Sequence, residues 1–351
     1  MIKINITNDI LNKIIEIEKN KTILENTKVP VNLQNAFRKN TKKKTTYYSN
    51  AIEGNLLTYN QASKVIEDRN RHLIKSEQEI LNYYLALEYL EKCLVEKKKI
   101  TLDLILDVQK IIVRGEPKEK EGIRGPMPPG VIFAVYENKT NQPEYIPPEY
   151  KDIDSLLNEL IDYLNNSNDH PIIKSAILHY QLVTIHPFGD GNGRTSRIMA
   201  SYLLSYYGYG FKSIGSIEEY FAYDIEEYYR SIQMNLPVLY YEGRDNPPHP
   251  EIWINYYLKV MSLYTNKVIS VAKEASENKT INIINNLSYK PNKFLKYLKK
   301  NNISEYIPIE IAKKLNVTNK TVINWSMELS NNGFVKPNIF KKRIRSYKVL
   351  Y

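Results

Sequence analysis

Apolar residues recur every three or four positions along most of the chain, and this spacing predicts amphipathic helices. The segments with this spacing are residues 10–17, 76–97, 101–112, 154–164 and 172–183. Pro30 interrupts the pattern in the N-terminal region, and Thr101 stands where an N-cap residue is expected. A further apolar helix is expected from Thr195 to Tyr207, ending at Gly208. The pattern therefore predicts a mainly α-helical fold.

Residues 117–150 break this helical pattern. Glycines and prolines at 122–130 indicate turns, and residues 131–136 are a run of apolar residues typical of a strand. We therefore expect one small β-hairpin between the helices.

The segment between two of these helices carries the residues best suited to chemistry. Residues 186–197 read His-Pro-Phe-Gly-Asp-Gly-Asn-Gly-Arg-Thr-Ser-Arg. Alternating glycines allow backbone N–H groups to surround an anion, and the following helix would direct the positive end of its dipole toward it. Arg194 and Arg197 lie three positions apart, so both can reach one anion. Asp190 suits Mg²⁺, and His186 suits a general base.

This segment matches the motif His-Pro-Phe-x-[Asp/Glu]-Gly-Asn-Gly-Arg-x-x-Arg at every fixed position, and the chain thereby resembles the Fic family. A glycine-rich turn with two solvated arginines is the alternative, but so long a match favours function. The resemblance implies a helical core with a β-hairpin flap, ATP and Mg²⁺ as cofactors, and transfer of AMP to a hydroxyl of a protein substrate.

The resemblance also implies a role for each motif residue. His186 would accept the proton of the target hydroxyl, Asp190 would hold Mg²⁺, and Phe188 would anchor the loop. The nucleotide would be bound by the residues between Asp190 and the end of the motif: Gly191, Asn192, Gly193, Arg194, Thr195 and Arg197. Of these, Arg194 would contact the β-phosphate and Arg197 the γ-phosphate.

An upstream segment resembles the inhibitory motif [Ser/Thr]-x-x-x-Glu-[Gly/Asn] that many Fic proteins carry. Ser49 and Glu53 are one helical turn apart, and Gly54 is a candidate helix end. By this resemblance Glu53 would pair with Arg197 and take the place of the γ-phosphate. The alternative is an ordinary Glu-Gly helix end, and the downstream motif favours inhibition.

Two further parts of the expected site rest on the resemblance alone. The flap that captures a target peptide would include Val131, Ile132, Phe133 and Ala134, with a plain surface hairpin as the alternative. The adenine pocket would include Tyr228, Tyr229 and Asn235, although aromatic residues at helical spacing also suit a core.

Positive charge is concentrated at the C-terminal end. Residues 290–351 hold 14 Lys and Arg against 3 Asp and Glu, whereas the whole chain of 351 residues has a net charge of +10. Residues 307–335 read as helix, turn and helix, with Thr318 as the cap of the second helix, followed by a basic strand pair. This order resembles a winged helix-turn-helix, which would bind DNA or dock a protein; a solvated basic surface is the plainer alternative.

Composition sets the broad class. An apolar content of 42% with 25% charged residues is typical of a globular protein, and no apolar run approaches the ~20 residues that span a membrane. The first 13 residues lack the apolar region of a signal peptide, and Cys93 is the single cysteine. A cytoplasmic protein without a disulfide is therefore expected.

These observations combine into one interpretation with stated alternatives. We expect an N-terminal helical region (1–95) with the inhibitory motif, a Fic core (96–265) and a winged-helix domain (285–351), with residues 272–286 as a polar linker. The function would be protein adenylylation at Ser, Thr or Tyr, including self-modification, with a homodimer as a possible assembly. The alternatives are a nucleotide-sensing DNA-binding regulator and a Fic enzyme that transfers another phosphate-containing group.

Overall fold

The computed structural model describes residues 3–69, 72–136, 143–236, 247–276, 289–340 and 343–350. The chain divides into two compact units. One consists of Met1–Thr22, Lys42–Phe211 and Ser216–Asn266, and the other of Ile23–Thr41, Lys212–Gly215 and Lys267–Tyr351. The predicted regions 1–95 and 96–265 both contribute to the first unit, and the predicted region 285–351 falls within the second.

Helices dominate the chain up to residue 276. In order they are α1 (Asn8–Asn26), α2 (Val31–Ile52), α3 (Tyr59–Glu67), α4 (Lys75–Val95), α5 (Leu102–Ile112), the 3₁₀ helix Lys118–Lys120, α6 (Tyr150–Asn166), α7 (Pro171–Ile185), α8 (Asn192–Tyr206), the 3₁₀ segment Phe211–Ser213, α9 (Glu218–Tyr223), α10 (Ile225–Gln233) and α11 (Pro250–Ser276).

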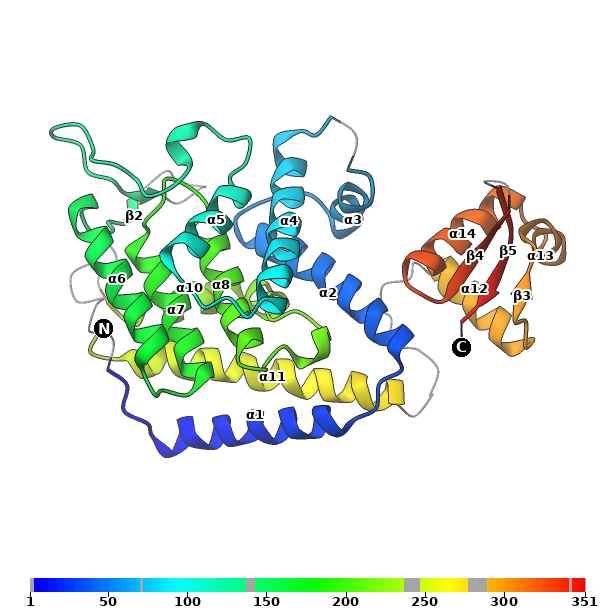
Figure 1. The fold of residues 1–351 in the computed structure, drawn as a ribbon, viewed down its shortest axis with the longest axis horizontal. Coiled ribbons are helices and arrows are strands. Elements are labelled where there is room, and N and C mark those ends of the chain that lie inside the picture. The colour runs from blue at the N-terminus through cyan, green and yellow to red at the C-terminus, as the bar shows by residue number, and fades with distance from the viewer. Residues whose placement is uncertain are drawn as a thin grey trace. The chain divides into compact units, whose positions relative to one another are not determined.

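Helices α7 and α8 form the centre of the first unit. Nearly all residues of both helices are buried, which is typical of helices surrounded by others on every side. Helix α8 packs against α7, α5 and α4, and Figure 1 shows these helices gathered together. The loop that joins α7 to α8 contains the motif of residues 186–197, so the packing of the core sets the position of that loop.

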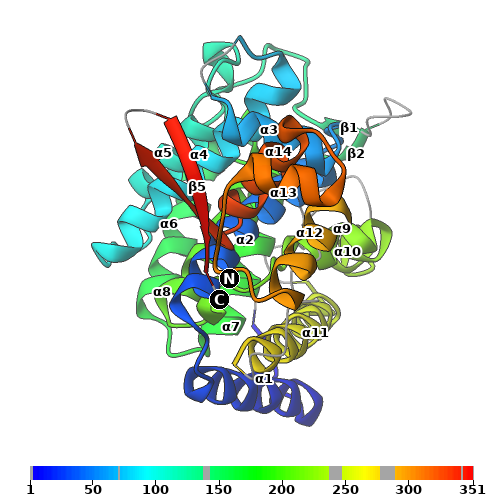
Figure 2. The same cartoon turned by 90° about the vertical axis from the view of Figure 1, so that its right-hand side faces the viewer.

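Helix α1 lies beside α11 in the views of Figures 1 and 2. Asn20 Nδ2 donates to Thr265 Oγ1 at 3.0 Å and to Asn266 Oδ1 at 2.9 Å, and Lys13 Nζ donates to Asn255 Oδ1 at 3.1 Å. These bonds tie the N-terminal helix to the last long helix of the first unit.

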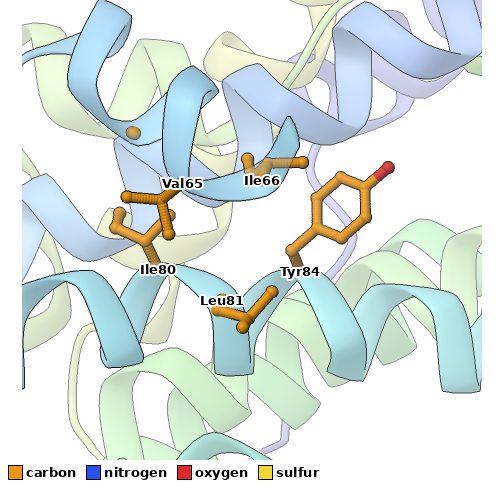
Figure 3. Packing of buried hydrophobic residues seen from close by; sticks show 6 residues of the cluster. Val65, Ile66, Ile80, Leu81 and Tyr84 are labelled. Carbon is orange, nitrogen blue, oxygen red and sulfur yellow. The ribbon is translucent and has the colours of Figure 1, made fainter. Parts of the chain in front are cut away.

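Helix α3 is held against α4 by a small apolar cluster. The cluster consists of Ala62, Val65, Ile66, Ile80, Leu81 and Tyr84. Figure 3 shows the last five of these residues meeting between the two helices. Thr58 begins α3 with a capping box, because its side chain accepts from the Gln61 N–H while the Gln61 side chain accepts from the Thr58 N–H.

The predicted hairpin is present but is shorter than expected. Strand β1 (Val135–Tyr136) pairs with β2 (Pro143–Tyr145) in antiparallel register, with Val135 opposite Tyr145. The prediction of a strand over 131–134 is wrong, because β2 is too short to pair with these residues. A turn immediately before them, in which the Val131 N–H donates to Pro128 O, also directs the backbone away from a ladder.

The second unit ends in three helices and a small sheet. The elements are α12 (Tyr289–Lys300), β3 (Glu305–Tyr306), α13 (Pro308–Leu315), α14 (Asn319–Asn331), β4 (Val335–Phe340) and β5 (Arg343–Val349), and the strand order is β3-β5-β4. Thr318 caps α14 by accepting from the Thr321 N–H. Buried aromatic residues join helix to sheet, with Tyr306 in contact with both Phe294 and Tyr347. The predicted helix, turn, helix and strand pair correspond to α13, α14, β4 and β5, whereas α12 and β3 were not predicted. The classification as a winged helix stays a prediction.

Residues 272–276, predicted as part of a polar linker, are helical instead. Helix α11 continues through Ser276, because Ala272 and Ala275 extend its buried face, and residues 277–288 lie outside the described residues. Among the helices that the structure describes, none has both the length and the apolar content that crossing a membrane requires.

Candidate active site

The motif loop turns sharply between α7 and α8. His186 ends α7 in the left-handed conformation with φ 49° and ψ 55°, and Gly191 precedes α8 with φ 81°. A side chain at Gly191 would be strained by this φ, and its Cβ would lie 3.2 Å from Ile112 and Val113. Glycine is therefore required at 191 for both backbone and packing reasons.

The side chain of Asn192 holds this loop together. Its Oδ1 accepts from the Phe188 N–H at 3.0 Å, and its Nδ2 donates to Phe188 O at 2.8 Å. Phe188 itself is fully buried, and its backbone bridges to Ile123. The amide of Asn192 is thus engaged with the loop backbone and positions the loop.

His186 is held in one orientation and one protonation state. Its Nδ1 lies 3.2 Å from Val183 O. Because a carbonyl only accepts, this bond requires a proton on Nδ1, which leaves the lone pair on Nε2. Burial is the main cause that lowers the pKa of His186 to about 4; the Val183 bond opposes the shift and the charge of Arg124 adds to it. The imidazole is therefore neutral and able to accept a proton near pH 7.

Arg124 connects the segment before the hairpin to the first residues of the motif loop. Its backbone N–H donates to Pro187 O at 2.8 Å and its Nε donates to His186 O at 3.0 Å. The guanidinium lies over the ring of Phe133, 4.5 Å from its centroid, and that ring is 6.1 Å from the His186 ring. Of the flap residues named from the sequence, Phe133 thus lies beside His186. Val131 and Ile132 are exposed and Ala134 is half-buried.

Asp190 is surrounded by three donors. Its Oδ1 accepts from the Gly191 N–H at 2.6 Å and from Arg194 Nη2 at 3.0 Å, and its Oδ2 accepts from Lys120 Nζ at 2.9 Å. Burial raises the pKa of Asp190, but the Lys120 bond and the Arg194 charge outweigh it and lower the pKa below its ordinary value. Asp190 is therefore an ionised carboxylate, and the Gly191 N–H is directed to it.

Gln109 fixes the segment that carries Lys120. The amide of Gln109 is fully buried, and its Nε2 donates to Lys120 O at 2.7 Å and to Asp190 O at 3.1 Å. Its Oε1 accepts from the Gly122 N–H at 2.9 Å. One side chain of α5 thus joins the 118–122 segment to the motif loop.

The beginning of α8 has the properties of an anion site. The N–H groups of the first turn have no partners within a helix, and the dipole is positive at this end. Arg194 Nε and Thr195 Oγ1 are buried and have no hydrogen-bond partner among the described residues. A group that supplies acceptors, such as phosphate, would satisfy both.

The carboxylate of Glu53 lies at this anion site. Arg197 Nη2 donates to Glu53 Oε1 at 2.7 Å and to Ser49 O at 2.8 Å, and Arg197 Nε donates to Ser49 Oγ at 2.9 Å. A Cβ at Gly193 would overlap Glu53 Oε1, so glycine is what permits the carboxylate to approach the helix. Gly54, with φ 85°, follows directly where α2 ends.

Of the three residues named for an adenine pocket, Tyr228 and Tyr229 have ring centroids 5.1 Å apart but differ in exposure. Tyr228 is buried, and its hydroxyl lies 2.8 Å from His179 Nε2. Tyr229 is 49% exposed, and Asn235 is also exposed. Of the two tyrosines, Tyr229 is therefore the one whose ring a base could reach, whereas Tyr228 belongs to the aromatic core with Phe221 and Trp253.

Sequence reasoning missed Lys120, Gln109 and the hydrogen bonds that Arg124 donates to the motif loop. None of the motifs named from the sequence includes these three residues. The described residues contain no group of three or more metal-binding side chains. A nucleotide-bound Mg²⁺ does not need such a group, because one carboxylate, phosphate oxygens and water complete its shell. Asp190 fits that role.

Comparison with known proteins agrees with this geometry. The Fic/DOC family model matches residues 99–204. The protein adenylyltransferase Fic of Drosophila willistoni and that of Drosophila virilis are each 35% identical over 170 residues, which cover 46% of this chain and 32% and 33% of theirs. The chain thus spans about a third of the length of the curated relatives it matches.

Solved structures share the fold. A Fic family protein from Desulfovibrio desulfuricans G20 has a TM-score of 0.62 at 19% identity and covers 100% of this chain and 98% of its own. Fic-1 from C. elegans has a TM-score of 0.58 at 21% identity and covers 77% of this chain and 74% of its own. Residues 99–204, which include the motif loop, thus match the Fic/DOC family model, and the chain shares the fold of these solved structures.

Proposed function

We propose that this chain is a protein adenylyltransferase that transfers AMP from ATP to a Ser, Thr or Tyr hydroxyl and is inhibited by its own Glu53. The observation that carries the proposal is the joining of a neutral His186 to an anion site by one short loop. The relatives named protein adenylyltransferase Fic support the same reaction.

The reaction would be an in-line displacement at the α-phosphate of ATP. The target oxygen forms a bond to phosphorus while the bond to the leaving pyrophosphate breaks, and the hydroxyl proton passes to His186 Nε2. Val183 O holds the imidazole in the tautomer that can accept this proton. Arg194, Thr195 and the first N–H groups of α8 would bind the phosphates. Asp190 would hold Mg²⁺, which neutralises phosphate charge when bound.

Inhibition would follow from competition for Arg197. Its guanidinium is buried and donates three hydrogen bonds, two to Ser49 and one to Glu53. A γ-phosphate that needs the same guanidinium would have to displace Glu53. While Glu53 stays, ATP would bind with its α-phosphate out of line for attack, and alignment accounts for much of the rate of such reactions.

Intact-mass spectrometry of the Glu53→Gly protein with ATP and Mg²⁺ tests the proposal. We expect the mass to increase by one or more AMP groups, because the chain has 29 tyrosines and many serines and threonines as targets. The size of the increase separates AMP transfer from transfer of another phosphate-containing group. His186→Ala in the Glu53→Gly background is the control and should lose about 10²–10⁴ in rate. An unchanged rate would exclude His186 as the base.

A second candidate is a DNA-binding regulator whose Fic core senses nucleotide. The observation that favours it is a pair of exposed lysines, Lys336 and Lys348, which stand directly opposite each other on β4 and β5. Like charges in such a pair repel each other, and a bound anion would relieve this repulsion, as Glu305 of β3 does in part from its place opposite Lys348. Under this candidate, nucleotide would alter DNA binding in His186→Ala as it does in the wild type, because no transfer is needed.

A further inference from the structure

Lys120 occupies the side of Asp190 on which a cation would bind. Its Nζ lies 2.9 Å from Asp190 Oδ2, whereas the other oxygen of Asp190 is already bonded to the Gly191 N–H and to Arg194. The ammonium is therefore placed on the oxygen that remains for a metal ion.

The backbone of Lys120 is held in place by contacts with Gln109 and with the motif loop. Gln109 holds its backbone carbonyl at 2.7 Å, and its Cα packs so closely on the motif loop that a Cβ at Gly189 would lie 3.3 Å away. The backbone of Lys120 is thus fixed beside the motif, and the ammonium can only move within the reach of its own side chain.

A second acceptor lies within that reach. Lys120 Nζ also donates to Glu116 Oε2 at 3.0 Å, and Lys75 Nζ lies 3.1 Å from Glu116 Oε1. The Lys120 ammonium can therefore stay bonded to Glu116 when its bond to Asp190 is broken. A monovalent and a divalent cation on one carboxylate oxygen repel each other, so a metal ion on Asp190 Oδ2 would favour movement of the ammonium to Glu116.

We propose that Lys120 is a resident cation on Asp190 that Mg²⁺ must displace toward Glu116 before the metal–nucleotide complex is bound. This inference rests on the proposed function, since it takes Asp190 as the metal ligand. Its consequence is that Lys120 weakens the contribution of Mg²⁺ to nucleotide binding and so sets the Mg²⁺ concentration that the enzyme requires.

The affinity of ADP measured calorimetrically with EDTA and with Mg²⁺ tests this without any turnover. The dissociation constant with EDTA divided by that with Mg²⁺ gives the metal's contribution. ADP is used because it lacks the γ-phosphate that, under the proposed function, competes with Glu53. In Lys120→Met the ratio should rise roughly tenfold over wild type, the size of one charge-assisted hydrogen bond. Lys118→Met, an exposed neighbour, should leave the ratio unchanged. Lys120→Arg keeps the charge and should give a ratio no higher than wild type.

The outcomes are separable from those of the proposed function. A ratio equal in Lys120→Met and wild type overturns the inference; if that shared ratio falls to one in Asp190→Asn, the role of Asp190 nevertheless stands. A ratio of one in wild type, Lys120→Met and Asp190→Asn alike overturns both. A lower ratio in Lys120→Met would identify Lys120 as a ligand of the bound complex and would also overturn the inference. Thermal unfolding of each variant, compared with wild type, reports whether it folds.

Discussion

Arg197 Nη2 lies 2.7 Å from Glu53 Oε1, and the two residues are 144 positions apart in the chain. The Arg197 side chain is 1% exposed and that of Glu53 is 35% exposed. Burial lowers the pKa of Arg197, but the charge of Glu53 outweighs it and raises the pKa above its ordinary value. The charge of the buried Arg197 guanidinium is thus compensated by the partly exposed Glu53 carboxylate. Loss of this ion pair should therefore both lower the stability of the fold and relieve the proposed inhibition.

Glu53→Gln should make the protein less stable and more active. The amide keeps the shape of the carboxylate but removes its charge, so the buried Arg197 loses its ionic partner and unfolding becomes easier by about 1 kcal/mol. ATP should raise the melting temperature of the variant more than that of wild type, because Arg197 becomes available to it. Thermal unfolding with and without ATP, together with self-modification, measures both effects. Equal ATP stabilisation in the two proteins would contradict the competition for Arg197.

The effect of Gly193→Ala on the free energy of unfolding should depend on the residue at position 53. In wild type the added Cβ overlaps Glu53 Oε1, so the substitution should be destabilising. In the Glu53→Gly background that overlap is gone, and alanine in a helix is better than glycine by roughly 1 kcal/mol. Denaturant unfolding of the four proteins of this double-mutant cycle measures the coupling. Additive effects would show that the carboxylate does not lie against Gly193.

The pH dependence of transfer should show a neutral His186 over a wide range. Because its pKa is lowered to about 4, chiefly by burial, the base form persists well below the ordinary histidine value. Single-turnover rates of Glu53→Gly should stay level from neutral pH down to about 5.5 and fall only near the lowered pKa. A transfer rate that falls by half near the ordinary histidine pKa would contradict the lowered pKa of His186.

The same shift affects stability, with a sign that follows from proton binding. The unfolded His186 binds a proton as pH falls below its ordinary pKa, whereas the folded one does so only near 4, so the unfolded state binds more protons between the two values. Its contribution to stability is therefore present above the unfolded pKa and is lost as pH falls toward 4. The free energy of unfolding should drop less over this range in His186→Gln than in wild type.

Binding of duplex DNA tests the C-terminal sheet. Replacing both Lys336 and Lys348 with Gln should weaken binding and reduce the slope of log affinity against log salt by about 2, if each contacts one phosphate. The matched control replaces the exposed Lys267 and Lys273 of α11, which removes the same charge outside the basic segment. Equal losses in both double variants would indicate general attraction only. No binding by wild type at low salt would favour a protein-docking role.

Much of the site could be predicted from the sequence because its geometry is local. His186, Asp190 and Arg194 are held by one loop whose glycines and Asn192 make its turns possible within a few residues. The helices were predictable for the same reason, since the apolar spacing of α4 and the caps Thr101 and Thr318 act over one or two turns. For Glu53, the sequence supplied a resemblance, and the structure places its carboxylate on Arg197.

Tertiary structure decided what depends on packing between distant segments. Tyr228 and Tyr229 are neighbours in sequence, but adjacent helical residues point in directions about 100° apart, so only the packing of α10 could send one to the core and the other to the surface. The strand predicted over 131–134 needed a partner that the short β2 does not provide. Lys120 and Gln109 carry no motif, and their contacts with Asp190 arise because α5 and the following segment pack on the motif loop. Local geometry is encoded by neighbouring residues, whereas the meeting of charges across the fold depends on the whole core.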